Sequence, residues 1–180
     1  MRVISGSARG RRLYCLDGDS VRPTLDRVKE SVFNMLTPYV PGAQGLDLFC
    51  GSGALGIEAL SRGAAHMTFV DKNEASLSIT RRNLELTRLA ENAKCILRDA
   101  LIFAEEADGP FDLILLDPPY GRGLAENALS AISKNHLLAD GGVIVLELDS
   151  TEPYDFCSQS FSVFRDKTYG RVRIILMKEL

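Results

Sequence analysis

The sequence predicts an α/β protein built on a mostly parallel sheet with helices on both faces. From residue 44 onward, short apolar runs alternate with stretches whose apolar residues recur at helical spacing. The apolar runs are nearly continuous, as at 111–116, which is typical of strands buried on both faces. At 180 residues and 46% hydrophobic composition, the chain is long enough for one domain with a real core and too short for two comfortable domains.

The N-terminal part is expected to form a small β-hairpin followed by a helix. Residues Met1–Tyr14 alternate around Gly6 and Gly10, a pattern typical of two short strands joined by a turn. Thr24 can cap the helix that follows, and Pro38 ends it.

Strands and helices then alternate along most of the chain. The expected strands lie at 45–49, 66–70, 94–98, 111–116 and 142–148, and the expected helices at 54–62, 74–89, 100–107 and 123–135. The chain closes differently, because two β-rich runs at 161–168 and 171–178 indicate an antiparallel hairpin. We therefore expect an N-terminal extension at 1–22 and a single α/β domain at 23–180.

Composition argues against several classes of protein. No apolar run reaches the roughly 20 residues of a membrane span, and the N-terminus lacks the apolar stretch of a signal peptide, so we expect a cytoplasmic protein with no membrane contact. The four cysteines lie far apart without a CxxC pair, and the chain has two histidines. Buried free thiols are therefore expected, with no metal site.

The charge of the chain is unevenly distributed. Residues 1–29 hold seven basic residues against three acidic ones, a local charge of +4, whereas the whole chain carries −3. Residues 30–180 therefore carry −7. A basic extension on an acidic body indicates contact with a polyanion. The alternative is a solvated basic edge that discourages aggregation.

A glycine-rich loop follows the first expected strand of the domain. Gly51, Gly53 and Gly56 satisfy a GxGxxG pattern at the start of a helix, where the backbone can approach a ligand and unpaired N–H groups point at it. The next strand ends at Asp71, twenty residues after Gly51, where a carboxylate can accept from both hydroxyls of an adenosine ribose. These features alone also fit a dinucleotide-binding dehydrogenase.

Asp47 favours a cationic ligand over a dinucleotide. It precedes the first glycine by four residues, where a carboxylate would repel a pyrophosphate and attract a cation. S-adenosylmethionine carries an ammonium group and a sulfonium centre, so it is the predicted cofactor; a helix cap or a turn is the alternative role for Asp47. Asp99, just after the third strand of the domain, is placed to accept from the adenine amino group, to cap the next helix, or to do both.

The strand at 111–116 ends in Asp117-Pro118-Pro119-Tyr120, at the sheet edge where ligands bind in open parallel sheets. Because the prolines fix the backbone, the Asp117 carboxylate and the Pro118 carbonyl become aimed acceptors for the two N–H groups of an exocyclic amine. Holding both hydrogens turns the nitrogen lone pair toward an activated methyl group, which needs neither a metal nor a covalent intermediate. Tyr120 offers a flat face for a base. An ordinary turn is the alternative reading.

With these motifs, the chain resembles the class I, Rossmann-like methyltransferases, whose glycine motif is matched at 47–56 and whose (Asn/Asp)-Pro-Pro-(Tyr/Phe) motif is matched at 117–120. It is similar in particular to the family that methylates N2 of guanine(966) in small-subunit (16S) ribosomal RNA. Further matching segments are Arg9-Gly10-Arg11-Arg12-Leu13, Arg22-Pro23-Thr24, Arg27-Val28, Phe33-Asn34-Met35-Leu36 and Tyr169-Gly170. The resemblance covers nearly the whole chain and implies a seven-stranded sheet whose last strand is antiparallel.

The resemblance also implies roles for individual residues. Those that would bind S-adenosylmethionine are Asp47, Gly51, Gly53, Asp71 and Asp99, and those that would hold the target guanine are Asp117, Pro118 and Tyr120. The substrate would be ribosomal RNA assembled with ribosomal proteins, so the basic extension would contact phosphates through Arg9, Arg11, Arg12 and Arg22. The target base would be taken from a loop or flipped from its stack. We expect a monomer beside this large partner.

Other functions remain open at the level of sequence. DNA adenine-N6 or cytosine-N4 methyltransferases and protein glutamine-N5 methyltransferases present a planar amine to the same tetrapeptide, but 180 residues leave no room for a separate DNA target-recognition domain. A non-catalytic RNA-binding module should lack the tetrapeptide. An NAD-dependent dehydrogenase needs a hydride-transfer residue, for which the sequence offers no persuasive candidate.

Overall fold

The computed structural model describes residues 1–15, 23–153 and 160–180. Two residues on which predictions were made, Arg22 and Cys157, lie outside these ranges. Of the other cysteines, all free thiols, Cys50 is buried as predicted, whereas Cys15 and Cys95 are partly exposed, so the prediction of burial was wrong for these two. Within the described ranges, no helix is long and apolar enough to cross a membrane.

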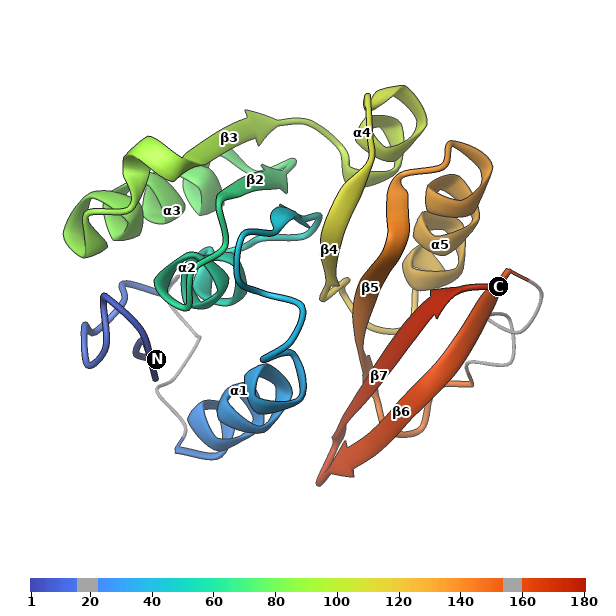
Figure 1. The fold of residues 1–180 in the computed structure, drawn as a ribbon, viewed down its shortest axis with the longest axis horizontal. Coiled ribbons are helices and arrows are strands. Elements are labelled where there is room, and N and C mark those ends of the chain that lie inside the picture. Colours follow the sequence, from blue (N-terminus) through green and yellow to red (C-terminus); the bar gives the residue numbers. More distant parts are fainter. Residues whose placement is uncertain (16–22, 154–159) are drawn as a thin grey trace.

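The centre of the fold is one seven-stranded sheet with the strand order β3-β2-β1-β4-β5-β7-β6 (Figure 1). The strands are β1 (Gln44–Asp47), β2 (His66–Asp71), β3 (Ala93–Leu97), β4 (Phe111–Leu116), β5 (Leu138–Asp149), β6 (Phe161–Tyr169) and β7 (Val172–Glu179). Strands β1 to β5 pair in parallel, and β7 runs antiparallel to both β5 and β6. The predicted α/β sheet with a C-terminal antiparallel hairpin is confirmed.

Within the described ranges, five α-helices cover the two faces of this sheet. They are α1 (Pro23–Met35), α2 (Ala54–Ser61), α3 (Glu74–Thr87), α4 (Ala100–Glu106) and α5 (Leu124–Lys134), and a 3₁₀ turn lies at Ala90–Asn92. Helices α1, α2 and α3 pack on one face, and α4 and α5 on the other (Figure 1). Both faces of the central strands are therefore buried, which explains the continuous apolar runs.

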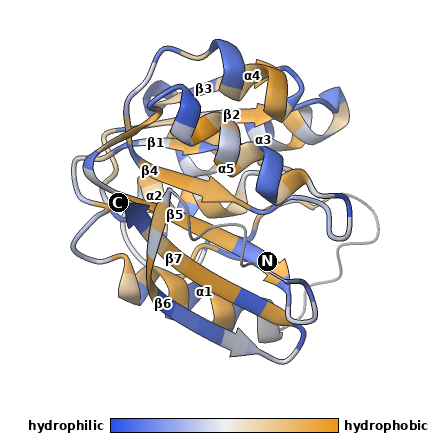
Figure 2. Ribbon diagram, turned by 90° about the vertical axis from the view of Figure 1, so that its right-hand side faces the viewer, coloured by the Kyte–Doolittle hydropathy of each residue, from blue (hydrophilic) through white to orange (hydrophobic). Residues whose placement is uncertain are grey.

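Successive residues of each central strand point into two separate cores. In β4, Leu113 and Leu115 pack under α1 to α3, whereas Ile114 and Leu116 pack under α4 and α5. This period of two is the geometry of a pleated strand. Strand β6 at the sheet edge is mostly hydrophilic, in contrast to the apolar β4, β5 and β7 (Figure 2). A polar edge strand discourages pairing with other chains.

Most of the predicted helix and strand boundaries lie within two residues of the observed ones. Two of the differences have an identifiable cause. Helix α1 begins at Pro23, so Thr24 lies inside the first turn and is not the residue before the helix. Proline is favoured at the first helical position, where its missing N–H costs no hydrogen bond. Strand β5 begins at Leu138 and not at 142, because Leu138 pairs with Phe111 ahead of a shift in register.

The N-terminal hairpin is present but short, with an antiparallel bridge between Arg2 and Arg12. Cross-strand backbone hydrogen bonds run from Val3 N–H to the Arg11 carbonyl at 2.9 Å and from Leu13 N–H to the Met1 carbonyl at 3.0 Å. Beyond the bridge, the backbone N–H groups of Ile4 and Ser5 donate to the Glu58 carboxylate of α2, at 2.8 and 3.0 Å. The extension also belongs to the core, since Val3, Ala8 and Leu13 are buried in the cluster under α1 to α3. Residues 1–15 of the extension are thus packed against the body through these side chains.

Candidate active site

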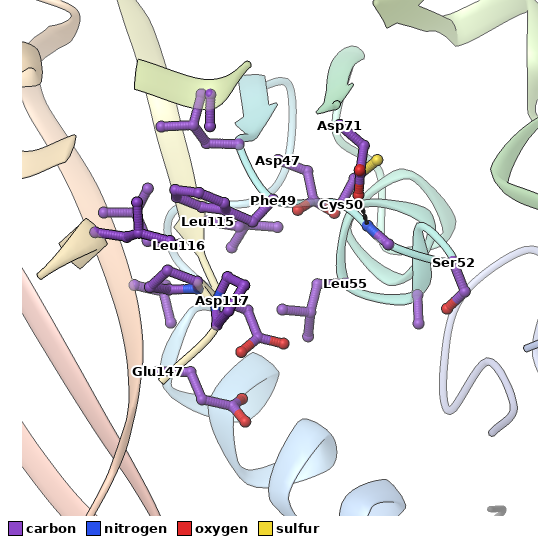
Figure 3. Close-up of a pocket in the computed structure, with 18 of the residues that line it drawn as sticks. Asp47, Phe49, Cys50, Ser52, Leu55, Asp71, Leu115, Leu116, Asp117 and Glu147 are labelled. Atoms are coloured by element: carbon purple, nitrogen blue, oxygen red, sulfur yellow. Dashed lines mark hydrogen bonds between the residues drawn. The ribbon is translucent and has the colours of Figure 1, made fainter. Parts of the chain in front are cut away.

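A cavity of about 560 Å³ lies at the carboxyl ends of β1 and β4, the two strands between which the strand order reverses. Open parallel sheets bind ligands at this switch point, because the loops that follow the two strands run to opposite faces. Figure 3 shows Asp47 and Asp71 on one side of the cavity and Asp117 and Glu147 on the other. The two predicted motifs, which are distant in sequence, therefore line one cavity.

The glycine loop is held in shape by contacts that require glycine. Gly51 and Gly53 have φ angles of 53° and 76°, in the left-handed region, and Gly53 is the residue before α2. A Cβ on Gly53 would lie 2.7 Å from Cγ2 of Thr80. The Thr80 hydroxyl donates to the Gly51 carbonyl at 2.9 Å, so α3 supports the loop from behind.

Asp47 lies at the end of β1 and is buried at 1% exposure. Its Oδ2 accepts from the Gly56 N–H at 3.0 Å, which ties the strand to the first turn of α2. Burial raises the pKa of the Asp47 carboxyl to about 7, against the opposing effect of this hydrogen bond. Asp47 therefore both anchors the helix and lines the cavity. A cation placed beside it would favour the ionised form.

Asp71 and Asp99 line the same cavity. Asp71 is the last residue of β2, and Asp99 immediately precedes α4. Asp71 accepts from Gly51 N–H at 3.0 Å through Oδ2 and from Asn73 N–H at 2.8 Å through Oδ1. Asp99 caps α4, where its Oδ1 accepts from Leu101 N–H at 2.9 Å. Asp99 thus caps the helix as predicted. Because it also lines the cavity, it can contact a ligand at the same time.

Asp117, Pro118, Pro119 and Tyr120 all line the cavity where β4 ends. The Tyr120 hydroxyl donates to Glu147 Oε1 at 3.1 Å, and its side chain is 43% exposed. Burial and the neighbouring Glu147 charge raise the pKa of Tyr120, so its hydroxyl stays protonated as a donor. A flat ring, a carboxylate and a fixed backbone turn thus face the same space.

Three buried or partly buried polar residues were not found from the sequence. Glu147 of β5 lines the cavity. It could have been found in the sequence as a carboxylate within the apolar run of this strand. Asn83 of α3 is fully buried, and its Oδ1 accepts from the Tyr14 N–H at 2.8 Å. Its Nδ2 donates to the Tyr14 carbonyl and to the Ser52 carbonyl, both at 2.9 Å. Asn83 thereby links the N-terminal extension to the glycine loop.

Lys29 of α1 is the third. It lies in the cavity wall at 3% exposure, and its Nζ is 3.2 Å from Oε2 of the fully buried Glu58. The same amine donates to the Arg2 carbonyl at 2.6 Å. Burial lowers the pKa of Lys29, while the Glu58 charge opposes that shift. The extension, α1 and α2 therefore meet at one buried ion pair beside the cavity.

Three of the four predicted RNA-contacting arginines, Arg9, Arg11 and Arg12, are exposed and do not line the cavity. The fourth, Arg22, lies outside the described residues. Among the described residues, no group of three or more His, Cys, Asp or Glu side chains could hold a metal ion.

Comparison with known proteins agrees with this arrangement. The model of the family described as conserved hypothetical protein 95 matches residues 1–178. YlbH of Bacillus subtilis is 41% identical over 182 residues, covering 99% of both chains. Ribosomal RNA small subunit methyltransferase D of Escherichia coli is 38% identical over 172 residues, covering 96% of this chain and 86% of the relative.

A solved structure gives the same result in three dimensions. The Escherichia coli protein yhhF superimposes on this chain with a TM-score of 0.87 at 37% identity, over 99% of this chain and 97% of that one. The family model spans almost the whole chain, and both relatives exceed 30% identity nearly from end to end. The chain thus belongs to the conserved hypothetical protein 95 family, the family of ribosomal RNA small subunit methyltransferase D, as its motifs predicted.

Proposed function

We propose that this protein transfers a methyl group from S-adenosylmethionine to the exocyclic N2 amine of a guanine in 16S ribosomal RNA. The observation that supports the proposal best is the shared cavity of the glycine loop and the Asp117-Pro118-Pro119-Tyr120 turn. Such a cavity brings a methyl donor and an amine acceptor together. An RNA substrate also agrees with the name of the Escherichia coli relative, a ribosomal RNA methyltransferase.

The residues around the glycine loop fit S-adenosylmethionine. In the proposed pose Asp47 faces the ammonium group, Asp71 accepts from the ribose hydroxyls and Asp99 accepts from the adenine amino group, while Gly51 and Gly53 let the backbone approach. These side chains are carboxylates, which attract a cationic ligand and accept hydrogen bonds from its N–H and O–H groups. When bound, the cofactor supplies a methyl group on a sulfonium, which takes the electron pair as the methyl carbon is attacked.

The proline turn supplies orientation. In this proposal the Asp117 carboxylate and the Pro118 carbonyl each accept one N2 hydrogen, and Tyr120 stacks on the base. The two bonds hold the N2 lone pair out of conjugation with the ring and direct it at the methyl carbon. The nitrogen gains the methyl group and gives up one proton to solvent.

The RNA is proposed to reach the site across the N-terminal extension. Arg9, Arg11 and Arg12 are exposed there for phosphate contacts, and Arg22 stays a prediction. We propose that the substrate is the small subunit during or after assembly, bound by a cytoplasmic monomer. The division into an extension at 1–22 and a methyltransferase domain at 23–180 is retained as part of this proposal.

The decisive experiment is methyl transfer from labelled S-adenosylmethionine to small ribosomal subunits isolated from cells that lack this protein. Subunits from cells that contain it are the matched control, because their target is already methylated. We expect label only in the first set and N2-methylguanosine as the labelled nucleoside by mass spectrometry. Label on another base amine would overturn the guanine assignment, and label only on DNA or protein would overturn the RNA assignment.

A further inference from the structure

Glu147 lines the cavity, but its carboxylate has no role in the methyl transfer proposed above. It lies in β5 between the buried residues Leu146 and Leu148, and it is itself partly exposed to the cavity. A carboxylate in a central strand costs free energy unless it has partners, so a polar ligand or neighbour should account for it. Its Oε1 accepts from the Tyr120 hydroxyl at 3.1 Å. Within the described residues, no hydrogen bond to Oε2 is found.

The sheet places Glu147 beside Asp117. Leu116 of β4 pairs in parallel with Leu146 of β5, so the residues that follow them, Asp117 and Glu147, are also neighbours across the two strands. Adjacent strands lie about 4.8 Å apart. Asp117 and Glu147 both continue the rows of Leu115 and Val145, which face the core under α1 to α3. Figure 3 shows the two carboxylates turned toward the same part of the cavity.

The Watson–Crick edge of guanine presents a matching pair of donors. Its N1–H lies next to its N2 amine, whereas adenine has a bare acceptor nitrogen at N1. Two acceptors side by side therefore suit guanine, and the second acceptor would repel the N1 lone pair of an adenine-type ring. A polar site discriminates most strongly through buried groups that the wrong ligand leaves unpaired.

We infer that Glu147 accepts the N1–H of the target guanine and so selects guanine over bases whose N1 is an acceptor. This inference rests on the proposed function and adds the residue that would set its base specificity. The Tyr120 hydroxyl holds Oε1 and thereby positions the carboxylate, leaving Oε2 for the base. Asp117 keeps the N2 amine, and Glu147 reads the neighbouring atom.

The test uses 2-aminopurine, which keeps the N2 amine but has an acceptor at N1. Small subunits are reconstituted with ribosomal RNA that carries either guanine or 2-aminopurine at the target position, and kcat/KM for methyl transfer is measured on each. We expect the wild-type protein to prefer guanine by about 10-fold to 100-fold, the range for a hydrogen bond to a charged group. Comparable rates on the two substrates would overturn the inference without any variant.

Glu147→Gln reverses the local chemistry at nearly constant volume, because its amide can rotate to donate to N1. We expect the preference for guanine to fall by at least about tenfold in this variant. Tyr120→Phe, which removes the hydroxyl and keeps the ring, should retain most of the preference even if its turnover is lower. Glu179→Gln, the same change at an exposed position at the end of β7, should leave the preference unchanged.

The outcomes separate this inference from the proposed function. Wild-type transfer to guanine, together with an unchanged preference in Glu147→Gln, would reject the role of Glu147 and leave the function in place. An unchanged preference in Glu147→Gln but a lost one in Tyr120→Phe would assign base selection to Tyr120. Failure of the wild-type protein to methylate the guanine substrate would overturn both.

Discussion

Lys29 and Glu58 form a buried ion pair, with Nζ and Oε2 3.2 Å apart and side-chain exposures of 3% and 0%. Glu58 also receives N–H groups of Ile4 and Ser5 from the extension and the guanidinium of Arg62, whose Nε lies 2.7 Å from Oε1. The pair therefore joins three segments that are distant in sequence. Buried pairs of this kind need several partners to offset the loss of hydration.

Glu58→Gln should destabilise the protein by about 3 kcal/mol, because the variant leaves the Lys29 charge buried without its counterion. The substitution keeps the side-chain volume, so the loss would report charge and not packing. Urea unfolding followed by circular dichroism would measure it. Glu105→Gln, at an exposed position of α4, is the control and should change the free energy of unfolding by less than about 0.5 kcal/mol. Equal stability of the two variants would contradict this account of Glu58.

Asp47 should give cofactor affinity a specific pH dependence. Burial raises its pKa in the folded protein to about 7, from an unfolded value near 4, so the folded form binds the extra proton between these values. The contribution of Asp47 to stability is thus present below about pH 4 and is lost as pH rises to about 7. A bound ammonium group favours the ionised carboxylate. The affinity for a cofactor that carries this group should therefore rise with pH, while the contribution of Asp47 to stability falls.

We expect the dissociation constant of S-adenosylhomocysteine to fall about tenfold between pH 6 and 8 in the wild-type protein, since roughly a tenth of Asp47 is ionised one unit below its pKa. Asp47→Asn keeps an acceptor for the Gly56 N–H and should bind more weakly, with a much flatter pH profile. Isothermal titration calorimetry would measure both. An identical pH profile in Asp47→Asn would remove Asp47 from contact with the ammonium group.

Asp117→Ala should reduce kcat by at least about 100-fold, because the N2 amine would lose one of the two acceptors that orient its lone pair. The dissociation constant of S-adenosylhomocysteine should stay within about threefold of the wild-type value, since Asp47 and Asp71, two of the proposed cofactor contacts, lie on the opposite side of the cavity. Asp140→Ala, at an exposed position away from the cavity wall, is the matched control. Near-normal turnover in Asp117→Ala would refute the amine-holding role.

Replacing Arg9, Arg11 and Arg12 together by alanine should weaken RNA binding and reduce its salt dependence. Each lost phosphate contact should lower the slope of log affinity against log salt concentration by about one. Filter binding to small subunits at several salt concentrations would measure the slope. The three side chains are exposed, so the fold should survive, which thermal unfolding would check. Unchanged binding would assign the arginines to a solvated edge.

The sequence alone predicted the sheet and the two motifs of the site. Apolar period and turn residues are local signals, so each strand and helix of the domain could be located within a few residues. The glycine loop and the proline turn are contiguous in sequence, and both follow parallel strands. Their meeting at one edge could be anticipated, because the carboxyl ends of parallel strands lie at the same edge of the sheet.

Other features were decided by tertiary structure. The neighbouring positions of Asp117 and Glu147 depend on the register between β4 and β5, which no local signal specifies. The attachment of the N-terminal hairpin to the body could not be predicted either, because the backbone N–H groups of Ile4 and Ser5 donate to Glu58, which α2 supplies from more than 50 residues away. The partners of a buried polar group come from elements distant in the chain and are fixed only when those elements pack. The sequence therefore determined which chemistry the site carries, and the packing determined which side chains surround it.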